Sequence, residues 1–289
     1  MENTDVEPVY EAVSRGLVHR RAISEVYLTE SARLQDGSFS VQGQWPRRHH
    51  FFRVEEERVD LVLAAETLRQ ATILVAHRYY SVPLGQSFLM GRLEVHLLEN
   101  QWSTEESPTD FELVVTVDNV RGRTLGPSAL RTTVSFSVCG HVFATGVGEL
   151  QILDPRLYAR MRPTSTRSDH LPPSDRFDER AWLRGVSLAP LEAHGHPSWI
   201  MNIDVQHPVF FDHPLDHVPG MVVIEAVRQA HALSGSPLRA FDGRFHSFLD
   251  LDPDRPVVLR GALPNQEHGG SVEYTVWQSE ARAATIKAA

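Results

Sequence analysis

The chain has almost no cysteine: Cys139 is the single one among 289 residues. One thiol cannot form an intramolecular disulfide or a cysteine-built metal site, and such usage is typical of a reducing compartment. Cys139 lies in the segment TVSFSVCGHVFATG, where apolar residues alternate with polar ones. We therefore expect a half-buried strand with a packed, unreactive thiol at this position.

An excess of basic residues and long apolar runs are also missing. The formal net charge is -9 at pH 7, whereas broad nucleic-acid binding needs a basic field over a sizeable surface. The N-terminal segment MENTDVEPVY is acidic where a secretory signal would be basic. No window holds the roughly 18 uninterrupted apolar residues of a membrane span. We expect a cytoplasmic protein that binds neither nucleic acid nor membrane.

Motifs for metal binding and for nucleophilic catalysis are absent as well. The sequence has 15 histidines, but none stands in an HExxH motif or a comparable ligand spacing. It has no GxSxG motif and no papain-like cysteine context. We therefore expect no metal ion, no cofactor and no covalent intermediate on serine or cysteine.

The chain does contain an internal repeat. The segment HHFFRVEEERVDLVLAAETLRQATIL, from His49, aligns without a gap on PVFFDHPLDHVPGMVVIEAVRQAHAL, from Pro208. In this register Glu66 meets Glu225, and the arginine three residues later and the glutamine four residues later also match. An ungapped match of this length indicates a tandem duplication.

Each half shows the same order of elements: strand-like segments, one apolar helix, then more strands. The first half spans residues 1–155 and the second 179–289, and the Pro-, Ser-, Asp- and Arg-rich stretch 156–178 is expected to be a linker. The helices should begin near Leu61 and Gly220. This plan predicts an α+β fold with each helix wrapped by an antiparallel sheet. The strand-like segments are AISEVYLTE, SFSVQGQW, FLMGRLEVHLLE, DFELVVTVDNV, RTTVSFSVCGHVFATGVGELQIL, WIMNIDVQ, VVLRGAL and SVEYTVWQ.

The second helix carries a first, partial resemblance to a known family. PGMVVIEAVRQ resembles the helix start of hotdog-fold 3-hydroxyacyl-ACP dehydratases, and Glu225 and Gln229 fall on the dehydratase glutamate and glutamine. The position of the catalytic histidine is occupied by Phe211, and His213 is displaced from it by two residues. A dehydratase or thioesterase on this fold is therefore an alternative function.

A second resemblance covers nearly the whole chain. LVHRRAISEVYLTE, QWPRRHHFF, ETLRQA and HPVFFDHPLDHVPGMVVIEAVRQA occur in the order found in the A-factor synthase (AfsA-like) family of actinobacterial autoregulator biosynthesis, to which the chain is similar. The resemblance implies a double hotdog, with two tandem repeats packed as a pseudo-dimer. It also implies an acyltransferase that joins a 3-oxoacyl group, delivered on acyl carrier protein, to the hydroxyl of dihydroxyacetone phosphate or a related small alcohol. The product leads to a γ-butyrolactone, butenolide or furan signal.

The charged residues inside the two apolar helices are the main site candidates. Glu225 and Arg228 are three residues apart, as are Glu66 and Arg69, so each pair lies on one helical face. A lone charge on an enclosed helix costs several kcal/mol unless it is paired or faces a ligand cavity. Acyl transfer to a phosphorylated alcohol needs a proton acceptor and a cationic anion holder, which these residue types supply. The alternative is two purely structural ion pairs.

We predict that Glu225, Arg228 and Glu66 are catalytic and that a further set binds substrate. The second repeat is favoured as the principal site because Gly220 and His213 occur only there, and a glycine at a helix N-terminus lets a ligand approach the backbone. The predicted substrate-binding residues are Arg69, His213, His217, Gly220, Gln229 and Phe211.

Other features leave two interpretations open. The cluster His19, Arg20 and Arg21 is either a solvated surface or a contact for carrier protein or phosphate. The paired phenylalanines before each helix either line an acyl tunnel or belong to the core. A catalytically silent acyl-binding hotdog module remains the rival to an enzyme, and a homo-oligomer is compatible with the sequence.

Overall fold

The structure is a computed structural model, and it describes residues 11–52, 59–98, 108–123, 126–163, 165, 167–168, 183–192, 196–233, 235–261 and 271–289. Two short 3-10 helices, Arg15–Val18 and Ile23–Glu25, lie near the start. The α-helices are α1 (Leu61–Tyr79), α2 (Pro155–Met161) and α4 (Gly220–Ala232). The strands of the first half are β1 (Leu28–Arg33), β2 (Phe39–Trp45), β3 (Ser87–Leu97), β4 (Thr109–Arg123), β5 (Gly126–Val138) and β6 (His141–Leu153). Those of the second half are β7 (Val186–Leu191), β8 (Ser198–Ile203), β9 (Ala240–Phe245), β10 (Val257–Gly261), β11 (Val272–Gln278) and β12 (Ala281–Ala288).

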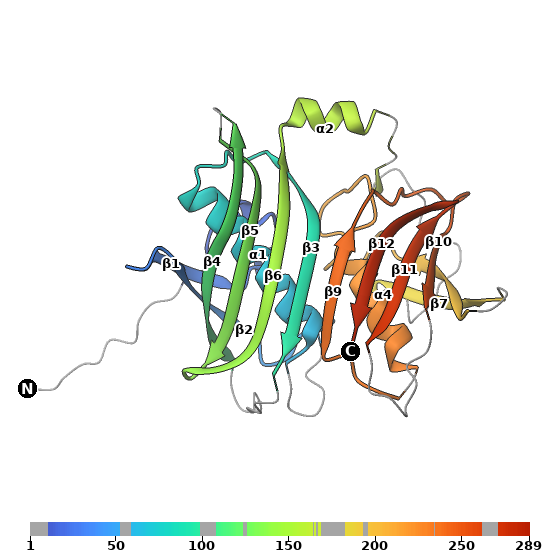
Figure 1. Ribbon diagram of the computed structural model, residues 1–289, viewed down its shortest axis with the longest axis horizontal. Coiled ribbons are helices and arrows are strands. Elements are labelled where there is room, and N and C mark those ends of the chain that lie inside the picture. The colour runs from blue at the N-terminus through green and yellow to red at the C-terminus, as the bar shows by residue number, and fades with distance from the viewer. Residues whose placement is uncertain are drawn as a thin grey trace, which may run out of the picture.

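All of these strands form one antiparallel sheet whose two halves repeat the same topology. The strand order of this 12-stranded sheet is β1-β2-β4-β5-β6-β3-β9-β12-β11-β10-β8-β7. Read outward from the centre, the order in the second half repeats that of the first, element for element. The two halves are therefore related by an approximate twofold axis between β3 and β9, where a single sheet continues across both (Figure 1). The predicted double hotdog with two repeats packed as a pseudo-dimer is confirmed.

The seam between β3 and β9 is held by backbone pairing and by an ion pair. Leu93 pairs with Gly243, and Arg92 donates to both carboxylate oxygens of Asp242 at 2.7 and 3.0 Å. Because side chains alternate along a strand, the buried Leu93 points toward the helices and Arg92 toward the opposite face. The seam thus contributes to the core on one face and carries charge on the other.

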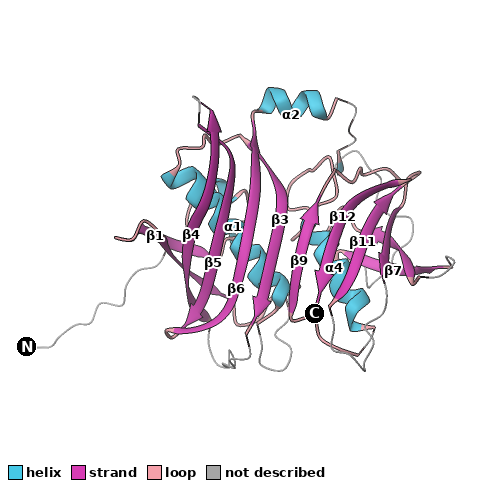
Figure 2. Cartoon of the chain, in the orientation of Figure 1, coloured by secondary structure: helices cyan, strands magenta, loops and turns pink. Residues whose placement is uncertain are grey.

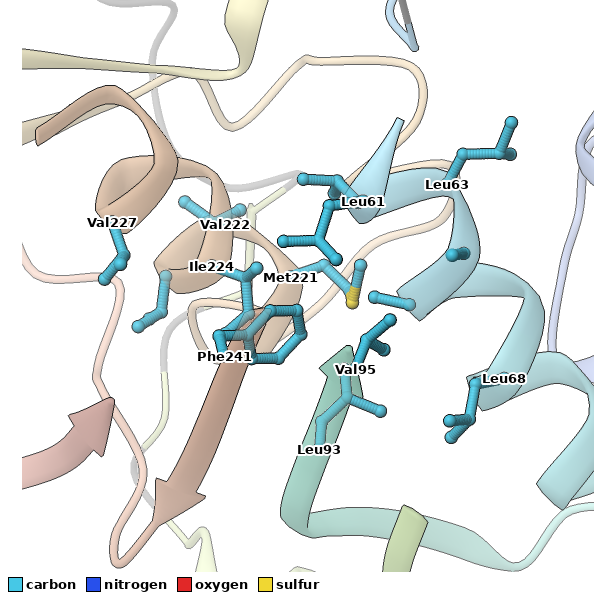
Figure 3. Packing of buried hydrophobic residues seen from close by; sticks show 14 of the residues in the cluster. Leu61, Leu63, Leu68, Leu93, Val95, Met221, Val222, Ile224, Val227 and Phe241 are labelled. Atoms are coloured by element: carbon cyan, nitrogen blue, oxygen red, sulfur yellow. The ribbon is translucent and has the colours of Figure 1, made fainter. Parts of the chain in front are cut away.

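The helices α1 and α4 lie on the same face of the sheet (Figure 2). Their first turns meet near the seam, where Leu61 and Met221 pack above Val95 and Phe241 (Figure 3). Asp60 caps α1 by accepting a hydrogen bond from the Val62 amide at 2.8 Å, which satisfies one of the free amides of the first turn. The helices begin at Leu61 and Gly220, as predicted. Both are apolar on most sides, and their glutamates, Glu66 and Glu225, are buried.

Three local expectations differ from the structure. Residues 23–25 form a 3-10 helix, and the first strand begins only at Leu28. Cys139 is exposed, because it occupies the tight turn between β5 and β6 with a positive φ of 49°, so the prediction of a packed thiol was wrong. The stretch expected to be a linker contains α2, which Asp154 caps. The boundaries 1–155, 156–178 and 179–289 stay a prediction.

In the described part of the chain, no helix combines the length and the apolar character needed to cross a membrane.

Candidate active site

The glutamates of the two central helices, and the arginines three residues after them, lie in two separate clusters. The Glu225 cluster contains Glu225, Arg228, Gln229, Arg184 and Asp60. The Glu66 cluster contains Glu66, Arg20, Arg69, Gln70, Asp212 and His213. Each cluster combines a helix of one half with residues supplied by the other half, so neither is complete within a single repeat.

The Glu225 cluster is built around a fully buried carboxylate. One oxygen of Glu225, Oε2, accepts from Nε of Arg228 at 2.7 Å and lies 2.6 Å from its Nη2. The other oxygen accepts from Gln229 at 2.9 Å and lies 3.8 Å from Arg184. Gln229 also donates to the Val186 carbonyl at 2.9 Å, which fixes the helix against β7. The predicted pairing of Glu225 and Arg228 is present, and the Glu225 carboxylate has a second arginine, Arg184, beside it.

Asp60 enters this cluster from the first half of the chain. Its Oδ2 accepts from Nη1 of Arg228 at 2.7 Å, while its Oδ1 caps α1. The guanidinium of Arg228 therefore bridges two buried carboxylates, one from each half. Asp60 was not among the site residues predicted from the sequence, because the alignment of the two repeats gave no sign that it contacts Arg228.

The surroundings of Glu225 raise its pKa above the usual value of a glutamate. Burial raises its pKa most, and the negative charge of Asp60 raises it further, although Arg228 and the Gln229 amide act in the opposite direction. A carboxylate with a raised pKa is a stronger proton acceptor, which suits a general base. Glu225 thus has the electrostatic environment that acid–base chemistry requires.

The variant Asp60→Asn tests this electrostatic effect. Asparagine keeps the helix cap and an oxygen for Arg228 but removes the negative charge, so the pKa of Glu225 should fall. A general base acts in its ionised form, so with Glu225 in that role the acidic limb of the pH profile of kcat/KM should move to lower pH. The measurement is that profile, compared with the wild type and with the exposed-site variant Asp110→Asn. An unmoved acidic limb would mean that Asp60 does not influence the base.

The Glu66 cluster has the same helical register but a different electrostatic outcome. Oε1 of Glu66 accepts from Gln70 at 2.8 Å and from Nη2 of Arg69 at 2.8 Å, and Oε2 accepts from Nε of Arg69 at 2.8 Å. Arg20 adds two contacts to Oε1, at 3.0 Å from Nε and 2.7 Å from Nη2. Burial alone would raise the pKa of Glu66, but Arg20 and Arg69 outweigh it and lower the pKa to about 2. Glu66 is a fixed anion and a poor proton acceptor.

Arg20 links the first half to the loop before α4. Its Nη1 donates to the Val209 carbonyl at 2.6 Å and lies 3.8 Å from Asp212. Burial disfavours the charge on Arg20, but Glu66 and Asp212 more than compensate and raise its pKa. The side chain is only 7% exposed. Of the two interpretations of the His19 to Arg21 cluster, a solvated surface does not describe Arg20.

The structure separates predicted site residues that the sequence analysis had grouped. His213 lies in the Glu66 cluster, bonded to Asp212 at 2.5 Å, and not beside Glu225. Arg69 lies there too, whereas Gln229 contacts Glu225. The residues predicted to form one site in the second repeat are thus divided between the two clusters. The reason is that the loop before α4, which carries His213, contacts the helix of the first half.

The remaining predicted residues have contacts away from either carboxylate. His217 donates from Nδ1 to Asp216 at 2.7 Å, next to Tyr158 of α2. A Cβ added at Gly220 would lie 3.0 Å from the Phe245 ring and 3.3 Å from the Met90 sulfur. Close packing against these side chains therefore explains the glycine. Phe211 is buried, with its amide donating to the His207 carbonyl at 2.9 Å.

The phenylalanines before the helices pack against one another at the junction of the halves. The rings of Phe51 and Phe210 lie edge to face at 4.9 Å, and Arg228 lies 5.9 Å above the Phe51 ring. Phe52 is buried as well. These residues form an apolar wall beside the Glu225 cluster and belong to the core.

Glu25, His49 and His50 have potential metal-ligand atoms within 4.8 Å of one another. Nδ1 of His49 accepts from the amides of Phe51 and Phe52 at 3.1 Å, so the ring proton lies on Nε2 and is donated to Glu25 at 3.2 Å. A protonated ring nitrogen has no lone pair for a metal. The donor set in this arrangement does not fit a divalent cation.

A cavity of about 400 Å³ lies elsewhere, between β1, β2 and β4 and the turn after β5. Its lining includes Tyr27, Gln42, Phe111 and Cys139. No residue of either charged cluster lines it. The cavity is therefore separate from the candidate chemistry.

Comparison with known proteins identifies relatives over most of the chain. A family model described as an A-factor biosynthesis hotdog domain matches residues 1–154 and 189–287. A Streptomyces virginiae protein named 2-oxo-3-(phosphooxy)propyl 3-oxoalkanoate synthase is 35% identical over 272 residues, covering 89% of this chain and 90% of that protein. A Streptomyces coelicolor protein of the same name is 32% identical over 234 residues, covering 78% and 73%.

Solved structures show the same fold at much lower identity. An acyl-ACP thioesterase from Bacteroides thetaiotaomicron superposes with a TM-score of 0.51 at 12% identity, covering 86% of this chain and 96% of the other. A putative thioesterase from Novosphingobium aromaticivorans gives a TM-score of 0.50 at 14% identity, covering 88% and 95%. These similarities concern the fold alone.

Proposed function

Because the chain belongs to the A-factor biosynthesis hotdog family, we propose that it is an acyltransferase that forms a 2-oxo-3-(phosphooxy)propyl 3-oxoalkanoate. The name of the Streptomyces relatives describes an ester. The two parts of that ester are a 3-oxoacyl group and dihydroxyacetone phosphate. The reaction is therefore attack of the alcohol oxygen on the carbonyl carbon of a 3-oxoacyl thioester, with loss of the thiol.

The observation that carries the proposed mechanism is the buried carboxylate of Glu225 beside Arg228 and Arg184. Glu225 accepts the proton of the attacking hydroxyl, the new C–O bond forms, the C–S bond breaks, and the proton passes to the departing thiolate. Arg228 and Arg184 supply positive charge for the phosphate and for the oxyanion of the tetrahedral intermediate. Arg184 is 29% exposed, so the cluster can be reached from its side. The raised pKa of Glu225 supports its assignment as the base.

The proposal also covers the source of the acyl group, the compartment of the reaction and the role of Glu66. The acyl group is delivered by acyl carrier protein, and the reaction takes place in the cytoplasm, where such thioesters are made. Glu66, which the sequence analysis assigned a catalytic role, stabilises the first helix as a fixed anion, since its carboxylate is held by two arginines.

The proposed reaction is tested directly by its product. The purified protein is incubated with a 3-oxoacyl thioester and dihydroxyacetone phosphate, and the phosphorylated ester is sought by mass spectrometry. Dihydroxyacetone without phosphate serves as the comparison substrate and should react much more slowly. Absence of the ester with either thioester carrier, acyl carrier protein or coenzyme A, would refute the proposal.

The variant Arg228→Lys should act mainly on binding of the phosphorylated alcohol. Lysine keeps the charge but loses the planar fork that can donate to two oxygens at once, so KM for dihydroxyacetone phosphate should rise about tenfold or more while kcat changes less. The measurement is steady-state kinetics at saturating thioester. Arg69→Lys is the matched control at the equivalent position of α1. Equal effects of the two substitutions on KM would argue against a phosphate contact at Arg228.

A further inference from the structure

The Glu66 cluster contains a histidine–aspartate pair that the proposed transfer does not use. Nδ1 of His213 lies 2.5 Å from Oδ1 of Asp212. Asp212 is buried, with 2% of its side chain exposed, and its other oxygen accepts from the Arg21 amide at 2.8 Å. The His213 side chain is 35% exposed. A buried carboxylate thus orients an imidazole that reaches solvent.

The hydrogen bonds determine where the protons of this pair lie. Burial would raise the pKa of Asp212, but the hydrogen bond from His213 and the charge of Arg20 outweigh it and lower the pKa to about 2. Asp212 is therefore ionised and accepts the Nδ1 proton of His213. In the neutral ring, Nε2 then carries a lone pair. Within the described ranges, no group hydrogen-bonds to this nitrogen.

The imidazole of His19, which contacts His77, lies near this pair and presents another hydrogen-bond acceptor. His77 donates from Nδ1 to the Val82 carbonyl at 2.7 Å, so its Nε2 accepts from Nε2 of His19 at 3.0 Å. The remaining nitrogen of His19, Nδ1, is left with a lone pair. Burial, and then the nearby charge of Arg69, lower the pKa of His19 to about 3, and His213 contributes to the same effect. His19 is neutral and close to both Arg69 and His213.

Arg69 provides the complementary donor. Its Nε and Nη2 are engaged by Glu66 and the Val18 carbonyl, whereas Nη1 makes no hydrogen bond to any residue in the described part of the chain. The side chain is 16% exposed. Arg69 and His213 both act electrostatically on His19, so the cluster offers a proton acceptor and a cationic donor near the same residue. Addition of water to a carbonyl requires these two groups.

The duplication gives this cluster the same framework as the Glu225 cluster. In both, a helix supplies glutamate, arginine and glutamine at the same spacing, and the other half supplies the crossing residues. The clusters differ in their exposed side chains. His213 supplies an imidazole in the Glu66 cluster, whereas the exposed residue of the Glu225 cluster is Arg184, which is not a base. The proposed transfer places a thioester carbonyl at the Glu225 cluster, and the Glu66 cluster has a glutamate, an arginine and a glutamine at the same spacing.

We propose that the Glu66 cluster is a second catalytic site, which hydrolyses the acyl thioester with His213 as general base. His213 takes a proton from water, the water oxygen bonds to the carbonyl carbon, the C–S bond breaks, and the thiolate receives the proton from His213. Nη1 of Arg69 donates to the carbonyl oxygen as its charge develops. The products are the free 3-oxo acid and the thiol. The choice of a 3-oxoacyl thioester as substrate rests on the proposed function.

The test separates hydrolysis from ester formation. The full chain is incubated with the 3-oxoacyl thioester of N-acetylcysteamine in water enriched in heavy oxygen, without any alcohol substrate. Labelled acid, together with the ketone formed by its decarboxylation, is measured by mass spectrometry, because exposed Cys139 would react with thiol reagents. The variants are His213→Gln, Asp212→Asn and Glu225→Gln. The control is His246→Gln, an exposed histidine bonded to Thr285.

We expect His213→Gln to lower the hydrolysis rate by about 10²-fold or more and Asp212→Asn by about tenfold or more, with ester formation within about twofold of wild type. Glu225→Gln and the control should hydrolyse normally. Wild-type hydrolysis no faster than in buffer, or unchanged hydrolysis in well-folded His213→Gln, overturns the second site. Loss of ester formation along with hydrolysis in His213→Gln overturns it too, since one site would serve both reactions. Hydrolysis without any ester in the wild type instead refutes the proposed transfer alone.

Discussion

Replacing Glu225 by glutamine should lower kcat for ester formation by a factor of about 10² to 10⁴ while leaving the protein folded. Glutamine has nearly the same shape and keeps an oxygen that can accept from Arg228, so the packing of α4 against β7 is preserved. It cannot accept the proton of the attacking alcohol. Steady-state kinetics with saturating substrates, alongside circular dichroism, measure the effect.

The matched control is Glu66→Gln, at the equivalent position of α1. Its carboxylate is held by Arg20 and Arg69, so its loss should destabilise the fold rather than slow the chemistry in molecules that remain folded. If Glu225→Gln keeps wild-type turnover, or if both substitutions reduce only the midpoint of thermal unfolding, the two clusters are structural and the proposed base is wrong.

Replacing Arg20 by methionine should reduce the free energy of unfolding by about 3–5 kcal/mol, the range for removing one partner of a buried ion pair. Methionine fills much of the same space but supplies no charge to Glu66, no donor to the Val209 carbonyl and no cation near Asp212. Urea denaturation at neutral pH measures the change. The exposed residue Arg15 offers a control, and Arg15→Met should lie within about 0.5 kcal/mol of wild type.

The pH dependence of stability provides a second measurement on the same variant. In the wild type the pKa of Glu66 is lowered from 4.5 to about 2. A depressed carboxylate pKa stabilises the fold above the unfolded value, and this stabilisation is lost as the pH falls toward the folded value. Without Arg20 the pKa of Glu66 should rise, so this part of the acid dependence between about pH 4.5 and 2 should shrink. An unchanged acid dependence and a loss under 1 kcal/mol would contradict the importance of Arg20.

The sequence was sufficient to predict the repeat, the two helix starts and the pairing inside each helix. The ungapped register placed Glu225 and Arg228 on one helical face, and the structure has them 2.6 Å apart. These features follow from local spacing, which a sequence records directly. The family resemblance then supplied the double hotdog, which local spacing alone did not.

The residues that the sequence analysis missed are those that cross between the halves. An alignment of two repeats compares residues in equivalent places, whereas the approximate twofold axis brings together residues in non-equivalent places, such as Asp60 and Arg228. Arg20 was hidden for a related reason. A basic run usually faces solvent, and its burial here depends on Glu66 and Asp212, which lie far away in the sequence. Arg184 precedes β7 and had no motif to mark it.

The continuous sheet across the seam also changes how single substitutions act. In a symmetric homodimer of one hotdog chain, every substitution at the interface would appear twice, so a useful change in one cluster would be imposed on the other. Here the two halves are separate parts of one polypeptide, so each substitution appears once. Asp60 forms an ion pair with Arg228, whereas its counterpart Pro219, the N-cap residue of α4, has no carboxylate. In the fused chain a substitution therefore changes only one side of the interface. This allows the two copies of one framework to have unequal acid–base properties.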